Sequence, residues 1–405
     1  MKNLPLIIGA IIVGVVIAFP IARKVKMTSM PQLVALFNGV GGGAAALVSI
    51  VEYLQAGESE SKGILAATVF TVIVGSVSFT GSILTFLKLQ EAITTRPIVI
   101  PGGQYITSLV AIGTIVAGVA LVINPATWLL VVLIVLSALL GLLLVLPVGG
   151  ADVPIIISLL NAFTGLSVAA SGYVLGNVLL IVAGTLVGAS GTLLTREMAK
   201  AMGRPLTNTM FGAFTATAVS ASAGGGEDRP VKSAGPEDVA IMLGYASKVI
   251  IVPGYGLAVA QAQHQIRELV DLLNEKGIEV DYAIHPVAGR MPGHMNVLLA
   301  EANVPYEQLK EMDEINPEFS STDVVMVVGA NDVVNPAAKS DPTAPIYGMP
   351  ILDVADAAQV VFLKRSMRPG FAGIENELLF DPKTTLLFGD AKDSLTKVVS
   401  AVKAM

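Results

Sequence analysis

Seven long apolar stretches in the first half of the chain constrain its fold more than any other feature. They cover residues 4–22, 32–52, 64–87, 104–123, 127–146, 153–174 and 177–195. A helix needs about 20 mostly apolar residues to cross the hydrocarbon core of a bilayer, and these stretches are long enough. We therefore expect residues 1–205 to form a bundle of seven transmembrane helices. The first stretch lacks the basic start and the cleavage site of a signal peptide, so we expect it to be retained as a span.

Basic residues in the short loops predict the orientation of this bundle, because Lys and Arg are retained on the cytoplasmic side of a membrane. They follow the first, third and seventh stretches: Arg23, Lys24 and Lys26, then Lys88 and Arg96, then Arg196, Lys200 and Arg204. This alternation places the N-terminus outside the cell and everything after residue 195 in the cytosol.

The interiors of the apolar stretches are rich in small residues and poor in charge. Residues 39–46 and 184–192 are mostly small, which is typical of close helix packing and, less often, of a ligand site. The polar exceptions are Asn38, Ser82, Asn161, Ser167 and Asn177. We find no ionisable residue deep in any stretch. Either the bundle is only an anchor, or the titrating group of a proton pathway comes from another subunit.

Residues 206–236 are a predicted tether between the two halves of the chain. This segment is rich in Gly, Ala, Ser and Thr, a composition that gives a flexible chain. A passive spacer and a functional hinge both fit it. Because the chain has no cysteine, it can hold neither a disulfide nor a thiolate metal site. Its net charge of −6 gives no basic footprint for nucleic acid, so we exclude that partner.

An apolar run at 249–252, followed by Gly254 and Gly256, predicts a ligand site in the second half. The run is typical of a buried strand, and the residues after the glycines of a helix that packs closely on a sheet. Free backbone N–H groups and the positive end of a helix dipole at such a turn suit a pyrophosphate, and glycine permits its close approach. Any tight turn between a strand and a helix also uses glycine, so the motif alone leaves both interpretations open.

Further strands alternate with helices over residues 237–405, which predicts a doubly wound parallel sheet of the Rossmann-like kind. We expect these strands at 278–284, 323–328, 350–354, 359–363 and 385–388, with a closing helix from 390 or 391 to about 403. The carboxyl ends of parallel strands form the ligand crevice of such a sheet. The loops that begin at Pro286, Gly329 and Lys364 should therefore converge on the Gly254 turn.

Lys364, Arg365 and Ser366 favour NADP as the dinucleotide, since two cations and a hydroxyl suit its 2′-phosphate. The second strand ends at His285 and not at the acidic residue that usually binds the ribose of NAD. Two alternatives stay open: Asp281 is that acid if the strand ends earlier, or the two cations are a solvated surface pair.

The three histidines do not suggest catalysis or metal binding. We expect His264 on a helix surface, and His285 and His294 as residues that position a glycine-rich loop. No two of them share metal-ligand spacing with a carboxylate, so we predict no metal. Among the acids, Asp332 and Asp390 are the better candidates for ligand contact.

Several ordered strings resemble one known family. They are PGYGLAVAQAQ at 253–263, IHPVAGRMPGHMNVLLAE at 284–301, GANDVVNPAA at 329–338, KRSM at 364–367 and FGDAK at 388–392. With these strings the chain resembles the β subunit of proton-translocating NAD(P)+ transhydrogenase over nearly its whole length. That family passes hydride between NADH and NADP+ while protons cross the membrane inward. The membrane part looks shorter than in relatives, by two preceding helices, so we expect a truncated or alternatively started chain.

The resemblance implies a partner and a location. The NAD(H) domain and further transmembrane helices would be on one or more α subunits, in a homodimer of the αβ assembly. The assembly would lie in the lipid of the cytoplasmic (inner) membrane of a bacterium, with the NADP(H) domain in the cytosol. The two cofactors carry out hydride transfer, so no residue is expected to act as a nucleophile or base.

The resemblance also implies site residues. The NADP contacts would be Gly254, Tyr255, Gly256, Val287, Ala288, Gly289, Arg290, Met291, Pro292, Gly329, Ala330, Asn331, Asp332, Val333, Gly348, Met349, Lys364, Arg365, Ser366, Met367, Arg368, Pro369, Gly370, Phe371, Asp390 and Ala391. In the membrane, Asn38 occupies the position of a channel histidine in some relatives, Ser82 matches a polar position of the family, and Asn177 is a further candidate. With Asn38 in place of histidine, the proton-carrying group should come from a helix of the partner.

Two other classes of protein fit parts of this pattern. A transporter or channel gated by a nucleotide-sensing Rossmann domain explains the seven helices and the dinucleotide fold equally well. It does not explain the string at 364–366 together with the loop at Pro286. A membrane-anchored reductase of a small organic substrate would need a substrate domain, for which the chain has no spare length.

Overall fold

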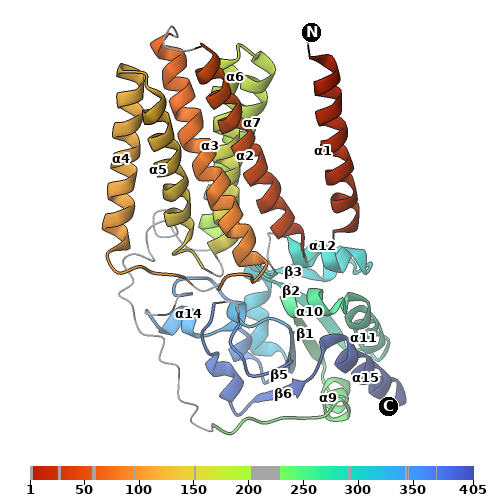
Figure 1. The fold of residues 1–405 in the computed structure, drawn as a ribbon. Coiled ribbons are helices and arrows are strands. Elements are labelled where there is room, and N and C mark those ends of the chain that lie inside the picture. The colour runs from red at the N-terminus through yellow and green to blue at the C-terminus, as the bar shows by residue number, and fades with distance from the viewer. Residues whose placement is uncertain are drawn as a thin grey trace.

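The computed structural model describes residues 3–25, 29–56, 61–94, 97–149, 152–201, 229–289, 293–342, 344, 346–370 and 372–405. Seven long helices are followed by an α/β domain built on a parallel sheet (Figure 1). The predicted fold class is confirmed. The predicted tether lies mostly outside the described residues, which resume at Arg229.

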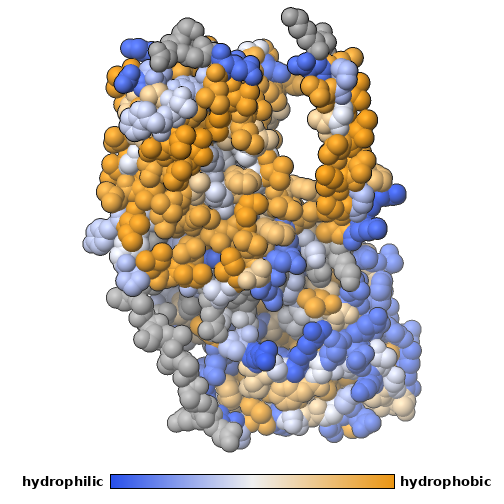
Figure 2. All heavy atoms as spheres, viewed as in Figure 1, coloured by the Kyte–Doolittle hydropathy of each residue, from blue (hydrophilic) through white to orange (hydrophobic). Residues whose placement is uncertain are grey.

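The membrane half consists of α1 (Leu4–Lys24), α2 (Met30–Ala56), α3 (Lys62–Leu89), α4 (Gly103–Ile123), α5 (Thr127–Val145), α6 (Val153–Val174) and α7 (Val178–Ala201). All seven are long and apolar enough to cross a membrane. Helix α3 is the most buried, and it packs against α2, α4, α5 and α6. None of the residues of α1 is buried. Figure 2 shows apolar side chains along α1 and an opening between it and the other helices.

The small residues of α6 and α7 form a packing seam. A Cβ atom placed on Gly165 would lie 2.5 Å from the backbone nitrogen of Gly188, and one on Gly184 would collide with the backbone of Ala169. Only residues without a larger side chain let the two helix backbones come this close. The packing interpretation of residues 184–192 is therefore confirmed.

The α/β domain is a single six-stranded parallel sheet. Its strands are β1 (Lys248–Pro253), β2 (Glu279–Ile284), β3 (Leu309–Glu311), β4 (Val324–Val328), β5 (Gln359–Lys364) and β6 (Thr384–Phe388). They lie in the order β3-β2-β1-β4-β5-β6. The chain leaves β1 toward one edge and returns to β4 on its other side, so β1 and β4 flank the switch point where such sheets bind ligands.

One predicted strand is wrong and one was missed. Residues 350–353 are irregular, and Val354 begins a 3-10 turn; Ile351 and Leu352 are apolar because they are buried in a loop. The short edge strand β3, Leu-Lys-Glu, carries no apolar run that could have predicted it.

Helices cover both faces of the sheet. They are α9 (Pro236–Gly244), α10 (Tyr255–Ala260), α11 (Gln263–Glu275), α12 (His294–Glu301), α13 (Met312–Ile315), α14 (Ala337–Ser340) and α15 (Ala391–Ala404), with 3-10 turns η4 (Tyr306–Gln308), η5 (Asn316–Ser321), η6 (Asp332–Val334), η7 (Val354–Asp356) and η8 (Glu377–Phe380). Successive strand residues point to opposite faces. In β1, Val249 and Ile251 face the core under α9, α11, α12 and α15, whereas Ile250 and Val252 face the core under η5, η7 and η8.

The α/β domain packs against one end of the bundle, with α14 beside the helix ends (Figure 1). Ile155 of α6 and Ala199 of α7 share a buried cluster with Ile346, Met349 and Ile351 of the domain. We name this cluster the bundle–domain contact. It brings the loops at the carboxyl ends of the strands toward the membrane helices.

Candidate functional site

The turns after β1 and β4 meet backbone to backbone at the switch point. The N–H of Gly254 donates to the carbonyl of Val328, and that of Gly256 to the carbonyl of Gly329, both at 2.9 Å. A Cβ on Gly256 would lie 2.6 Å from the Cα of Gly329, which itself has a φ of +69°. The glycines are therefore needed to join two turns. The N–H groups of Gly254 and Gly256 are therefore bound by β4 and its turn, and the binding of a pyrophosphate at this turn stays a prediction.

The loops after β4 and β5 are joined by side chains of the predicted set. The Oδ2 atom of Asp332 accepts from the backbone N–H of Ala372 at 2.8 Å, and Asn331 Nδ2 donates to Asp332 Oδ1 at 3.1 Å. Asn376 Nδ2 donates to the carbonyl of Asn331 at 3.1 Å. A Cβ on Gly370 would collide with Asp332. The predicted residues at 329–333 and 364–370 thus form one surface.

The two predicted phosphate-binding cations also lie at this surface. Lys364 Nζ donates to Asn331 Oδ1 at 3.1 Å, and Arg365 Nη2 donates to Asp390 Oδ2 at 2.5 Å. Burial lowers the pKa of Lys364, and the nearby Asp332 carboxylate partly opposes this shift. The Arg365 side chain is 60% exposed, so it is accessible to an anion.

Asp390 is fixed at the start of α15. Its Oδ1 atom accepts from the backbone N–H of Lys392 at 3.0 Å, which caps the helix. Desolvation raises the pKa of Asp390, but hydrogen bonds from Arg365 and from the Lys392 N–H outweigh it and hold the pKa below its usual value. Asp390 is therefore an anion at neutral pH.

The loop after β2 is held by a neutral histidine. His285 is buried; its Nε2 donates to the carbonyl of Pro350 at 2.8 Å, and its Nδ1 accepts from the N–H of Val287 at 3.2 Å. Burial lowers the pKa of His285 to about 4, although the bond to Pro350 opposes the shift. The predicted positioning role of His285 is confirmed by these bonds. They also bring the loop of Val287 next to Met349.

The remaining predicted residues of this region are partly described. The ring of Tyr255 lies 6.3 Å from that of His294, centroid to centroid, and a Cβ on Gly289 would collide with His294. Gly348 has a φ of +80°. Arg290, Met291, Pro292 and Phe371 lie outside the described residues. His264 is exposed, as predicted.

The membrane helices contain a second candidate site, a polar cluster that joins α2, α3 and α6. Asn38 Nδ2 donates to Ser82 Oγ at 2.9 Å and to Ser78 Oγ at 3.3 Å. Ser78 in turn bonds to the Leu160 carbonyl at 2.9 Å and to Thr164 Oγ1 at 2.6 Å. The Oδ1 atom of Asn38 is buried and accepts no hydrogen bond from the described residues.

Sequence reasoning found half of this cluster. Ser78 and Thr164 were missed, although Ser78 lies four residues before Ser82 and therefore on the same side of a helix. Asn177 is not brought to the cluster: its Oδ1 caps α7 by accepting from the N–H groups of Leu179 and Leu180 at 3.0 and 3.3 Å. Its role in a proton pathway stays a prediction.

Comparisons with known proteins agree with this architecture. The sequence model of the NAD(P) transhydrogenase beta subunit family matches residues 1–401. The chain belongs to this family. Two curated relatives, the NAD(P) transhydrogenase subunit beta of Rhodospirillum rubrum and that of a named strain of the same species, are each 49% identical to it over 405 residues, covering 98% of this chain and 87% of the relative. Membership of the transhydrogenase beta family rules out the nucleotide-gated channel and the small-substrate reductase.

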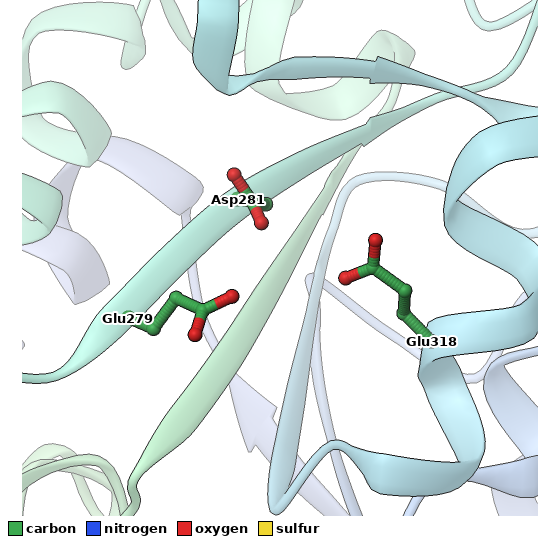
Figure 3. Close-up of side chains that lie close together, drawn as sticks. All are labelled: Glu279, Asp281 and Glu318. Atoms are coloured by element: carbon green, nitrogen blue, oxygen red, sulfur yellow. The ribbon is translucent and has the colours of Figure 1, made fainter.

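The structure excludes the alternative that Asp281 is the acid that binds the ribose. Strand β2 continues to Ile284, so Asp281 lies within it and away from its carboxyl end. Figure 3 shows Asp281 beside Glu279 and Glu318, whose carboxylates all lie within 4.8 Å of one another. Lys248 Nζ binds Glu279 at 2.9 Å and Glu318 at 2.5 Å. The cluster therefore has its own cation, at the opposite ends of the strands from the candidate site.

Lys88 lies in a helix, where the sequence did not predict it. Helix α3 extends to Leu89, so Lys88 belongs to its last turn and not to a loop. Lys88 is 1% exposed. The prediction that Lys88 lies in the loop after the third apolar stretch is therefore wrong, because Lys88 is buried in the last turn of α3.

Proposed function

We propose that this chain is the NADP(H)-binding, membrane-spanning subunit of a proton-translocating transhydrogenase. It would exchange hydride between NADP(H) at the carboxyl ends of its parallel strands and NAD(H) on a partner α subunit. The observation that carries the proposal is the joined surface of the β4, β5 and β6 loops, with Lys364, Arg365 and Asp390 at the switch-point side of a sheet that follows seven membrane helices.

The residues of this surface fit a phosphorylated dinucleotide. Arg365 is an exposed planar cation that can bind a phosphate through two N–H groups, and Lys364 lies next to it. The neutral His285 follows β2, where an acid would repel a 2′-phosphate. The bound cofactors supply the hydride chemistry, while this chain's residues orient the nicotinamide ring and exclude water from it.

Proton coupling would start at the polar cluster of Asn38, Ser78, Ser82 and Thr164. The buried Oδ1 atom of Asn38 can accept a hydrogen bond from a protonated group on a helix of the partner. Protonation there would change how the helices meet the α/β domain, and hence the affinity for NADP(H). Such a link between proton and cofactor is a coupling free energy between two sites.

The proposed surroundings are the cytoplasmic (inner) membrane of a bacterium, with a homodimer of the αβ assembly. We propose that the N-terminus is outside and the α/β domain is in the cytosol. Arg23 and Lys24 support this orientation, because they end α1 on the side of the bundle where the domain lies (Figure 1).

The test is a reconstitution of the chain with an α subunit in lipid vesicles. We expect hydride transfer from NADH to NADP+ that depends on both chains and that an imposed proton gradient accelerates. Hydride transfer by the β chain alone, or a rate that no gradient changes, would contradict the proposal.

A further inference from the structure

Lys88 is a buried cation among the membrane helices, and its surroundings are built from backbone. Its Nζ atom donates to the carbonyls of Val145 at 3.1 Å, Leu146 at 2.6 Å and Val148 at 2.6 Å. A lysine ammonium has three donors, so these three bonds use all of them. The carbonyls belong to the last residue of α5 and to the turn after it, where the helix dipole favours a positive charge.

Burying this charge is expensive, which makes a purely passive role unattractive. Ionisable side chains buried among membrane helices are costly and usually mark functional positions. A polar side chain with one hydroxyl would cap a single carbonyl at much lower cost. Lys88 instead ties three carbonyls of another segment to α3.

Lys88 also lies close to the first turn of α6. Thr85 and Lys88 of α3 enclose one small space together with Val148 of the turn and with Val153 and Ile156 of α6. The neighbouring Ile155 is 1% exposed and belongs to the bundle–domain contact. Lys88 is therefore separated from the α/β domain by one short turn and one helix start.

The opposite direction along α3 leads to the polar cluster. Ser82 lies six residues before Lys88, which corresponds to about 9 Å of helix. Ser78, Ser82, Thr85 and Lys88 are all buried, none exposing more than 1% of its surface. Helix α3 thus carries Ser78 and Ser82, which bind Asn38, and further along the same helix Lys88, which binds the α5–α6 turn.

We propose that Lys88 is a positioning residue for coupling: it fixes the α5–α6 turn, and through Ile155 the bundle–domain contact, to the helix that holds the partners of Asn38. This inference rests on the proposed proton-coupled function. A displacement of α3 at the polar cluster would move the carbonyls bound by Lys88. The α5–α6 turn would then shift Ile155 in the bundle–domain contact, where it packs with Met349.

The test uses the complete αβ assembly in vesicles and compares the hydride-transfer rate with and without an imposed proton gradient. Lys88→Met keeps the apolar stem but removes the three donors. We expect it to reduce the stimulation by the gradient by about fivefold or more, the lower end of typical coupling between sites. The rate without a gradient and the affinity for NADP+ should change little. Lys88→Arg, which keeps a cation and several donors, should restore part of the stimulation.

Lys62→Met is the matched control, because Lys62 is an exposed lysine at the other end of the same helix. It should behave as the wild type does. If Lys88→Met retains full stimulation, or lowers the rates with and without the gradient by the same factor, the inference is wrong. If Lys88→Met is not recovered in membranes, Lys88→Gln, which keeps two donors without charge, is judged by the same outcomes. Absence of gradient stimulation in the wild type would reject the proposed function, and this inference with it.

A second measurement follows the bundle–domain contact directly. Because the chain has no cysteine, Ile155→Cys introduces a single thiol into it. We expect a water-soluble maleimide to label this thiol slowly when Lys88 is present and several-fold faster when Lys88→Met is added. Equal labelling rates would show that Lys88 does not position this contact and would overturn the inference.

Discussion

Replacing Arg365 by glutamine should weaken the binding of NADP+ and spare that of NAD+. Arg365 Nη2 donates to the carboxylate of Asp390 at the start of α15, and the Arg365 side chain is exposed enough to bind an anion. A hydrogen bond to a charged group contributes about 1.5–3 kcal/mol. We expect Arg365 to contribute at the lower end of this energy range, because its side chain is 60% exposed and because a phosphate must compete with Asp390 for it. A loss of about 1.4 kcal/mol corresponds to a tenfold higher Kd.

Titration calorimetry of the purified αβ assembly with NADP+ and with NAD+ measures this effect. Lys403→Gln is the matched control, because Lys403 is also an exposed cation in an ion pair, at 2.5 Å from Glu268, but at the far end of α15. An unchanged Kd for NADP+, or an equal rise in Kd for Lys403→Gln, would refute the assignment of Arg365 to the 2′-phosphate.

The partner of Arg365 offers a test with the opposite sign. Asp390→Asn keeps an oxygen that can cap α15 but removes the fixed negative charge beside Arg365. The affinity for NADP+ should then rise by a few-fold, since the phosphate no longer competes with a carboxylate. The effect should shrink at high salt, because exposed charges are screened. A lower affinity would instead show that the Asp390 carboxylate itself contacts the ligand.

Three further outcomes are expected. Asn38→Leu should abolish most of the gradient-stimulated hydride transfer in vesicles while NADP+ binding to the same assembly stays unchanged; equal loss of both would contradict the separation of the two sites. Burial lowers the pKa of His285 from about 6.5 in the unfolded chain to about 4. The free energy of unfolding should therefore be highest above pH 6.5 and should fall by up to about 3 kcal/mol as the pH drops toward 4, because His285 then becomes protonated first in the unfolded chain. His285→Asn should flatten that dependence in thermal unfolding at a series of pH values. Gly256→Ala places a Cβ atom 2.6 Å from Gly329 Cα and should lower the unfolding free energy by about 1–3 kcal/mol; an unchanged unfolding free energy would contradict the close approach of the two turns.

Local patterns predicted most of the fold. The seven helices follow from the length of the apolar stretches, and five of the six strands from short apolar runs bounded by Gly and Pro. The error at 350–354 has a physical reason: burial alone makes Ile351 and Leu352 apolar, whether or not they pair in a sheet. The edge strand β3 is held by its pairing with β2, from Tyr282–Leu309 to Ile284–Glu311, which no local pattern indicates.

Contacts between distant segments explain what the sequence left open. The N–H groups of Gly254 and Gly256 are taken by the turn after β4, more than 70 residues later in the chain, so their use could not be read from the motif. Lys88 looked like a loop cation because it follows an apolar stretch. Its burial depends on three carbonyls near the end of α5, nearly 60 residues away.

The isolation of α1 has a consequence for how this subunit is assembled. Since none of its side chains is buried, α1 makes little packing contact with the other six helices and adds little to their stability. Its sideways position in the bilayer is therefore decided by whatever fills the opening seen in Figure 2, whether lipid or another polypeptide. A chain without α1 should still fold as a compact six-helix unit. The position of α1 would then be fixed only when the complete complex has assembled.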